Sequence, residues 1–120
     1  MAQSDAFLPL TAVVFEILLA LADGPRHGYE IMLEVERRAE GRVALHAGTL
    51  YRALARLLEQ GCIEELDSPP PATETDDERR RYYRMTSLGR AVAAAEAHRL
   101  AGQVAAARAK RLLARSEKTS

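Results

Sequence analysis

Apolar residues recur along the first third of the chain with the spacing of two helices. Residues 11–22 are apolar on almost every side, with Glu16 as the only charge, and the turn residues 23–25 end the segment. Such a helix needs cover on more than one side, from its own core and from another subunit. Residues 27–39 carry apolar side chains at helical spacing, and Gly41 follows where a helix-ending glycine belongs. The pattern predicts two helices.

A third helix is predicted to begin at His46, or at a residue next to it, and to end at Gly61. It is the best-defined element of the sequence. Its apolar positions fall on one face, which consists of Leu50, Leu54, Leu57 and Leu58. The apolar residues 43–45 before it can form a short extra strand.

Two short runs after the third helix predict a hairpin. Residues 62–66 and 81–85 contain β-tolerant or aromatic side chains, and the prolines 69–71 lie in the polar segment between them. Because side chains alternate along a strand, we expect one of Tyr82 and Tyr83 in the core and the other on the surface.

A long final helix follows the hairpin. Thr86 or Ser87 can cap it, and its alanine-rich sequence continues to about Arg115. A single apolar stripe runs along it, formed by Leu88, Val92, Leu100, Val104 and Leu112. A helix of this length with one stripe usually packs against something outside its own small domain.

Three helices followed by a hairpin is the element order of a winged helix-turn-helix, in which the third helix enters the major groove of DNA. We therefore predict a mainly α (α+β) fold with a two-stranded β-wing. Composition adds little to this prediction, because 17 basic and 17 acidic side chains give a formal net charge of zero. The charges are unevenly distributed, with an acidic excess in residues 64–78 and a basic excess from Arg79 onward.

The third helix carries the first candidate for chemistry. With its leucines turned inward, Thr49, Arg52 and Arg56 form an outward stripe at three- and four-residue steps. Arginine can bind guanine edges through two hydrogen bonds, and threonine can contact a base methyl group or a phosphate. The alternative is a solvated helix face, on which basic residues are common.

The returning strand of the hairpin carries the second candidate. Arg79, Arg80, Arg81 and Arg84 surround the two tyrosines where a wing would meet the phosphate backbone. The alternative is that these arginines pair with the acidic residues 76–78, at little gain in stability.

Three segments, HGYEIMLEV, GTLYRALARLLEQGCIE and RRRYYRMTSLGR, together resemble the PadR family of bacterial transcriptional regulators. The resemblance covers residues 10–90 in order and spacing, and the remaining helix resembles the dimerisation helix of the family's short members. It implies a winged domain in residues 8–86, a dimerisation helix in 87–115, and flexible tails in 1–7 and 116–120.

The resemblance also implies a homodimer that binds a two-fold promoter operator in double-stranded DNA. The family's tyrosines map onto Tyr29, as a phosphate contact, and onto Tyr51, which can reach DNA or wedge the helix against the core. His46 stands with Ala47 where many relatives have Ser-Pro, and we include it in the DNA-binding set. The implied dimer contacts join helix one to the last helix through Val14, Phe15, Leu18, Val92, Leu100, Val104 and Leu112.

Many PadR-like proteins are repressors that a small molecule releases, some through a tryptophan pocket. This chain contains no tryptophan, so a hydrophobic or aromatic effector would have to use Phe15, aliphatic side chains or the alanine-lined helix interface. The rival hypothesis is a winged-helix protein-interaction module without DNA binding, which the zero net charge and the acidic wing favour.

Other functional classes have little support in the sequence. No phosphate loop, nucleophile elbow or dinucleotide motif is present, so we expect neither an enzyme nor a cofactor. The potential soft metal ligands lack zinc spacing, and Cys62 fits a small buried residue better than a redox switch. Residues 1–7 do not resemble a signal peptide and residues 12–22 are too short to span a bilayer, so we expect a cytoplasmic protein.

Overall fold

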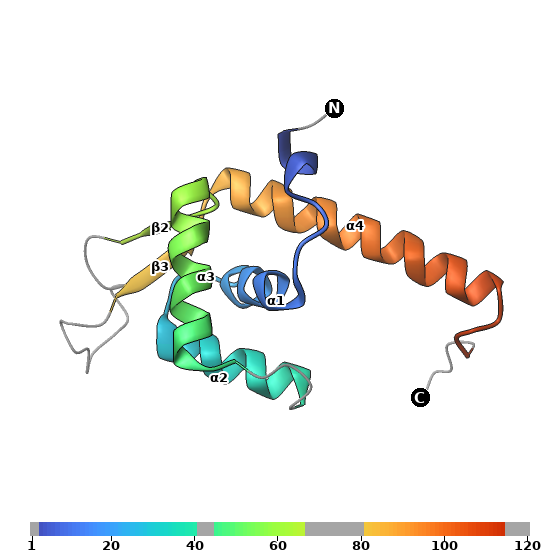
Figure 1. The fold of residues 1–120 in the computed structure, drawn as a ribbon, viewed down its shortest axis with the longest axis horizontal. Coiled ribbons are helices and arrows are strands. Elements are labelled where there is room, and N and C mark those ends of the chain that lie inside the picture. The colour runs from blue at the N-terminus through green and yellow to red at the C-terminus, as the bar shows by residue number, and fades with distance from the viewer. Residues whose placement is uncertain (1–2, 41–44, 67–80, 115–120) are drawn as a thin grey trace.

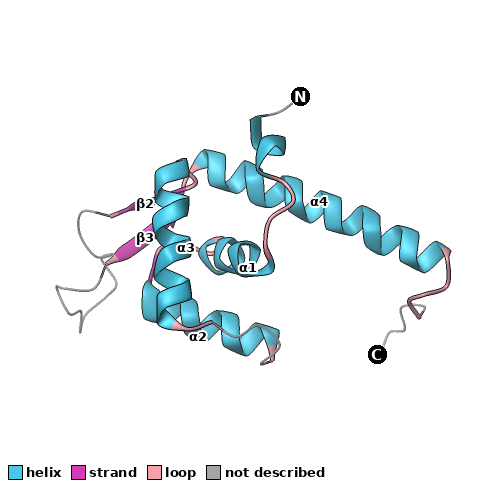
Figure 2. Ribbon diagram, in the orientation of Figure 1, coloured by secondary structure: helices cyan, strands magenta, loops and turns pink. Residues whose placement is uncertain are grey.

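The computed structural model describes residues 3–40, 45–66 and 81–114. Within these ranges, four α-helices pack together beside a small antiparallel sheet (Figure 1), and Figure 2 shows the sheet next to α3. The elements in chain order are the 3-10 helix η1 (Gln3–Phe7), α1 (Ala12–Leu21), β1 (Arg26–His27), α2 (Gly28–Ala39), α3 (Ala47–Gln60), β2 (Ile63–Glu65), β3 (Tyr82–Met85) and α4 (Ser87–Ala109). The predicted order of helices and hairpin is confirmed. The stretch 43–45 falls largely outside the described residues.

Helix α1 lies at the centre of the fold, which explains its lack of a polar face. It contacts α2, α4 and β3, and Figure 1 shows it nearly end-on between α2, α3 and α4. Ile17 and Leu18 have no exposed surface, and Leu21 is 2% exposed. Most of the cover that the apolar pattern requires therefore comes from the same chain.

The sheet has three strands in the order β1-β3-β2, all antiparallel. The predicted hairpin of β2 and β3 is confirmed, but the two-residue strand β1 was not predicted. The expectation that one tyrosine of β3 is exposed was wrong, because Tyr82 and Tyr83 are 4% and 2% exposed. Tyr83 joins the hydrophobic core. Tyr82 pairs with His27 of β1, whose ring packs edge-on against it at 5.2 Å between centroids.

The sequence predicts the C-terminal end of α3 well and the C-terminal end of α4 poorly. Gly61 ends α3 in the left-handed conformation, with φ 80°, and the Cys62 amide donates to the Leu57 carbonyl at 2.9 Å. Helix α4 ends at Ala109 and not near Arg115 as expected. Arg111 there adopts φ 64° without being a glycine, so the sequence carried no stop signal.

The segment before α1 is ordered against α4. We expected residues 1–7 to be a tail, but Gln3–Phe7 forms η1, which packs on α4. The Glu96 side chain of α4 is 2% exposed, and the Leu10 backbone amide is one of the groups that lower the pKa of its carboxyl. Arg99 donates to both carboxylate oxygens of Glu96, at 2.8 and 2.7 Å.

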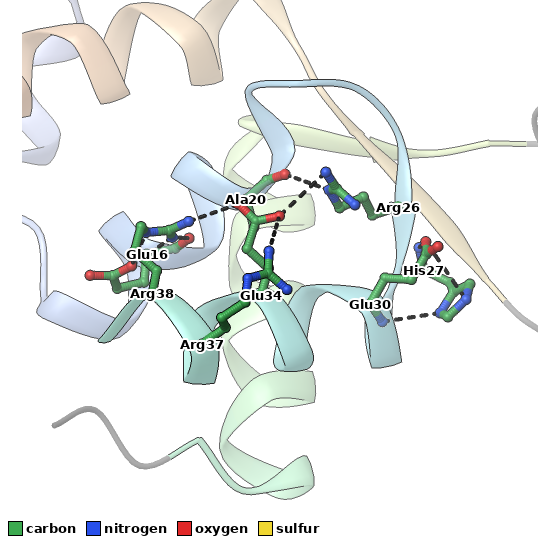
Figure 3. Close-up of polar contacts among 8 residues, drawn as sticks. All are labelled: Glu16, Ala20, Arg26, His27, Glu30, Glu34, Arg37 and Arg38. Atoms are coloured by element: carbon green, nitrogen blue, oxygen red, sulfur yellow. Dashed lines mark hydrogen bonds and ion pairs between the residues drawn. The ribbon is translucent and has the colours of Figure 1, made fainter. Parts of the chain in front are cut away.

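An ion-pair network joins α1 to α2 (Figure 3). Arg38 donates to the Glu16 carboxylate at 2.9 Å through Nε and to Glu34 at 2.8 Å through Nη1. Arg26 of β1 lies 3.3 Å from Glu34 and also donates to the Ala20 carbonyl at 2.9 Å. The network links α1 and β1 to α2, the helix that contacts α3. Within the ranges described above, no helix is both long and apolar enough to cross a membrane.

Candidate nucleic-acid interface

Helix α3 turns its leucines into the core and its arginines to solvent. Leu50, Leu54 and Leu57 are at most 2% exposed, as their spacing predicted. Arg52 and Arg56 are exposed one turn apart on the outward face. Both guanidinium groups are therefore accessible on the outward face, whereas Thr49, the third residue of the predicted stripe, is half-buried.

The side chains of the stripe have few partners among the residues that the structure describes. The only contact joining Thr49 to Arg52 is a marginal 3.5 Å between Oγ1 and Nη2. Within the part of the chain that the structure describes, Arg56 makes no hydrogen bond or ion pair. Guanidinium groups without protein acceptors keep their full set of donors for a ligand such as a base edge or a phosphate.

His46 stands at the N-terminal end of this face. It is the N-cap residue of α3, is exposed, and makes no capping hydrogen bond with its side chain. Its imidazole is therefore not committed to the first-turn amides of α3, which a helix leaves without backbone partners.

Tyr51 and Tyr29 are both about half exposed, at 51% and 56%. The Tyr51 hydroxyl lies so close to Gly28 that a Cβ atom on that glycine would be 2.6 Å from it. Tyr51 therefore packs against the start of α2 and also keeps half of its surface in solvent. The two alternatives for Tyr51 were that it wedges the helix against the core and that it reaches DNA. Its position is compatible with both, because one side of the ring packs against α2 and the other is in solvent.

The start of α2 is fixed by a reciprocal pair that sequence reasoning missed. The Glu30 amide donates to His27 Nδ1 at 3.3 Å, and the His27 amide donates to Glu30 Oε1 at 3.1 Å (Figure 3). This is a capping box with histidine at the N-cap. The glutamate three residues after the cap was the available signal, but histidine is not a usual first residue of this motif. The box places Tyr29 in the first turn of α2, next in sequence to Gly28, against which Tyr51 packs.

The two wing arginines that the structure describes, Arg81 and Arg84, pair with glutamates that were not considered from the sequence. Arg84 donates from Nε to Glu64 Oε2 at 2.8 Å, and Arg81 Nε lies 3.7 Å from Glu65 Oε2. Both glutamates lie on β2, the strand opposite. The pairs are exposed, and exposed ion pairs contribute little, so a phosphate can replace the glutamates at small cost. Arg79, Arg80 and residues 76–78 lie outside the described residues.

The proposed dimer contacts divide into two groups. Val14, Phe15 and Leu100 are half-buried, while Val104 and Leu112 are 42% and 79% exposed. Leu18 and Val92 are fully buried within the single chain and have no surface left for a partner.

Other side chains with possible chemistry are committed to structure. Cys62 has no exposed surface, and burial raises the pKa of its thiol, which disfavours the reactive thiolate. This agrees with its interpretation as a small core residue. Among the described residues, no three metal-binding side chains are grouped closely enough to hold an ion.

The geometry defines a winged helix-turn-helix protein with an exposed arginine face on its third helix. Comparison with known proteins gives the family: the model of the transcriptional regulator PadR-like family matches residues 17–95. The chain belongs to the PadR-like family of transcriptional regulators.

Two curated relatives are themselves uncharacterised. The chain is 38% identical over 91 residues to a 37.1 kDa protein of transposon TN4556 from Streptomyces fradiae, across 73% of this chain and 24% of that protein. It is 35% identical over 75 residues to protein X of Lysinibacillus sphaericus, across 62% of this chain and 65% of that protein. The chain thus spans less than two thirds of either relative.

Solved structures share the fold. A transcriptional regulator from Clostridium thermocellum is 28% identical with a TM-score of 0.61, across 87% of this chain and 94% of that chain. A PadR family regulator from Clostridium difficile is 21% identical with a TM-score of 0.65, across 82% and 96%. Bacillus subtilis PadR, solved in complex with operator DNA, is 20% identical with a TM-score of 0.55, across 68% and 44%.

Proposed function

We propose that this protein is a DNA-binding transcriptional regulator whose α3 reads base edges with Thr49, Arg52 and Arg56. The observation that carries the proposal is the exposed face of α3, where Arg56 has no partner among the described residues and Arg52 has only a marginal one. Membership of the PadR-like family supports it, as does the fold shared with a PadR protein that was solved on operator DNA.

The remaining DNA contacts in the proposal go to the phosphate backbone. Tyr29, His46 and Tyr51 lie at the ends of α2 and α3, and the wing contributes Arg79, Arg80 and Arg81. Phosphate contacts of this kind fix the register of a protein on the duplex without reading sequence. The glutamate partners of Arg81 and Arg84 would be exchanged for phosphates on binding.

We also propose that the active form is a homodimer. The support is that Val104 of α4 and Leu112, which follows the end of that helix, expose apolar surface, and that Val14, Phe15 and Leu100 are half-buried. Leu18 and Val92 now belong to the protomer core in this proposal. Two-fold symmetry would present two recognition helices to a two-fold operator. We further propose that the protein acts as a repressor in the cytoplasm, and that a small-molecule effector releases it from the operator.

The test is fluorescence anisotropy with labelled DNA from upstream of the protein's own gene. A regulator should bind this duplex more tightly than a scrambled duplex of equal length, and the affinity should fall steeply as salt rises. Equal, weak binding to both duplexes at every salt concentration would contradict the proposal.

A protein-interaction module is the second candidate, favoured by the pairing of Arg81 and Arg84 with glutamates of the same wing. Such a module would show no DNA affinity at moderate salt and would co-purify with a partner protein. The same anisotropy experiment therefore separates the two candidates.

A further inference from the structure

A cleft of about 490 Å³ opens between α3 and the segment that leads into α1. Its apolar wall comes from Phe7, Pro9, Leu10 and Val14, the last of which is also one of the proposed dimer contacts. Its polar end comes from Arg56 and Gln60 of α3. The volume lies in the range of small-molecule sites, which combine apolar walls with a few polar groups that orient the ligand.

The wall formed by the N-terminal segment is held in place by a buried charge. The 3-10 helix η1 packs on α4, where the buried Glu96 is paired with Arg99, and the Leu10 amide helps to lower the pKa of the Glu96 carboxyl. The cleft is therefore bounded by two elements that the core fixes, α3 and the anchored segment before α1. A site with fixed walls loses little entropy when a ligand binds.

The charge of the cleft selects the ligand class. None of the described residues that line it is acidic, and Arg56 is its one charged side chain among them. Arg56 has no partner within the described chain, and a guanidinium group binds a carboxylate through two parallel hydrogen bonds. Apolar walls with one such group at the end fit a molecule with an apolar chain and a single carboxylate.

From these features we infer that the cleft binds an aliphatic carboxylate, and that the ligand competes with DNA for Arg56. Arg56 lies one helical turn from Arg52 on the face proposed to read DNA. Because a carboxylate in the cleft would occupy its guanidinium, Arg56 cannot bind the ligand and DNA at the same time. The second part of this inference, competition between the ligand and DNA, is its regulatory half, and only this part rests on the proposed function. Carboxylate binding in the cleft is independent of that function.

The test is calorimetric titration of the intact protein with octanoate, 1-octanol and octylamine, which share a chain and differ in head group. Octanoate should bind at least tenfold more tightly than the other two. Arg56→Gln should remove that preference, whereas Arg52→Gln, on the same face but outside the cleft, should retain it. Equal binding of the three compounds, or unchanged octanoate binding by Arg56→Gln, overturns the inferred site.

The regulatory half is tested by repeating the DNA titration with saturating octanoate. The DNA affinity should fall by about the factor that Arg56→Gln itself causes, and DNA should weaken octanoate binding by the same factor. Octanoate that binds without changing the DNA affinity overturns the competition. A protein that binds octanoate but no DNA overturns the proposed function and the regulatory half together, and leaves the site standing.

Sedimentation of the same samples tests whether octanoate acts by changing the oligomeric state of the protein. Octanoate should leave the sedimentation coefficient unchanged. A shift toward a different oligomer would place the ligand between subunits and overturn the inferred site.

Discussion

Gly89 lies where the first turn of α4 passes the backbone that follows α3. A Cβ atom there would lie 1.9 Å from the Cys62 carbonyl oxygen, and that oxygen accepts a hydrogen bond from the Thr86 amide at 3.0 Å. Backbone held in this way cannot move aside as the end of a flexible side chain can. The close approach of α4 to the wing therefore depends on the absence of a side chain at this position.

We expect Gly89→Ala to lower the free energy of unfolding by about 1–3 kcal/mol or more, the usual cost of overpacking. Gly102→Ala is the matched control on the same helix, because a Cβ atom there meets nothing within 4 Å. The control should raise the free energy of unfolding by roughly 0.5–1 kcal/mol through helix propensity. Urea denaturation measures both, and a stable Gly89→Ala protein would refute the close approach.

Arg52 and Arg81 separate base reading from phosphate binding. Arg52→Gln should relax the preference for one base pair by about 1–3 kcal/mol, the contribution of a two-hydrogen-bond contact to discrimination. Arg81→Gln should weaken binding to all duplexes about equally and make it less dependent on salt. Anisotropy with a set of single-base operator variants distinguishes the two patterns. Identical patterns for both substitutions would contradict the division of roles.

At the scale of elements, Glu96 links α4 to the segment before α1. The hydrogen bond from Arg99 is the main cause that lowers the pKa of the Glu96 carboxyl, and the Leu10 amide adds to it against the effect of burial. Since the folded pKa lies below the unfolded one, this carboxylate stabilises the fold fully above the unfolded value of about 4.3. That stabilisation is lost as the pH falls through the folded pKa.

Glu96→Gln should therefore flatten the acid side of the stability profile. We expect the wild-type protein to lose more free energy of unfolding than the variant between about pH 5 and pH 3, the range around the unfolded pKa. Glu59→Gln on the exposed surface of α3 is the control and should follow the wild type. Parallel profiles for all three proteins would show that Glu96 contributes no pH dependence.

The elements differ in how far the sequence predicts them, for physical reasons. The apolar spacing of α3 and the glycine after it specify the helix by themselves, and its arginine face follows from the same spacing. The strand β1 has only two residues, too few for a period-two pattern. Because His27 on β1 covers Tyr82, the burial of both tyrosines was not predictable from alternation along β3 alone.

Contacts between elements account for most of the remaining differences. The capping box of His27 and Glu30 uses a residue type that rarely caps helices in this way. Glu64 and Glu65 meet the wing arginines only through the register of β2 and β3, which the sequence does not specify. The cleft beside Arg56 depends on the ordering of η1, a segment that composition alone suggests to be a tail.

At the scale of the whole molecule, α4 extends well past the domain core (Figure 1). Its N-terminal part supplies the buried Val92 and Glu96, while Val104 farther along the helix and Leu112 beyond its end expose apolar surface. If the protein is a dimer through this region, Val104→Asp should shift sedimentation toward a monomer and leave the helical circular dichroism largely unchanged. Val104→Leu is the conservative control and should remain dimeric. A Val104→Asp protein that sediments as the wild type does would exclude this surface from the interface.

The central claim is that the arginine face of α3 binds DNA, and the most direct measurement compares the wild type with an Arg52→Gln, Arg56→Gln double variant on one operator duplex. Both side chains are exposed, so the variant should fold with unchanged stability. At moderate salt we expect its anisotropy titration to show binding weaker by at least about thirtyfold, in keeping with the loss of two contacts of about 1–3 kcal/mol each. Equal affinity of the folded variant and the wild type for the operator would contradict the account.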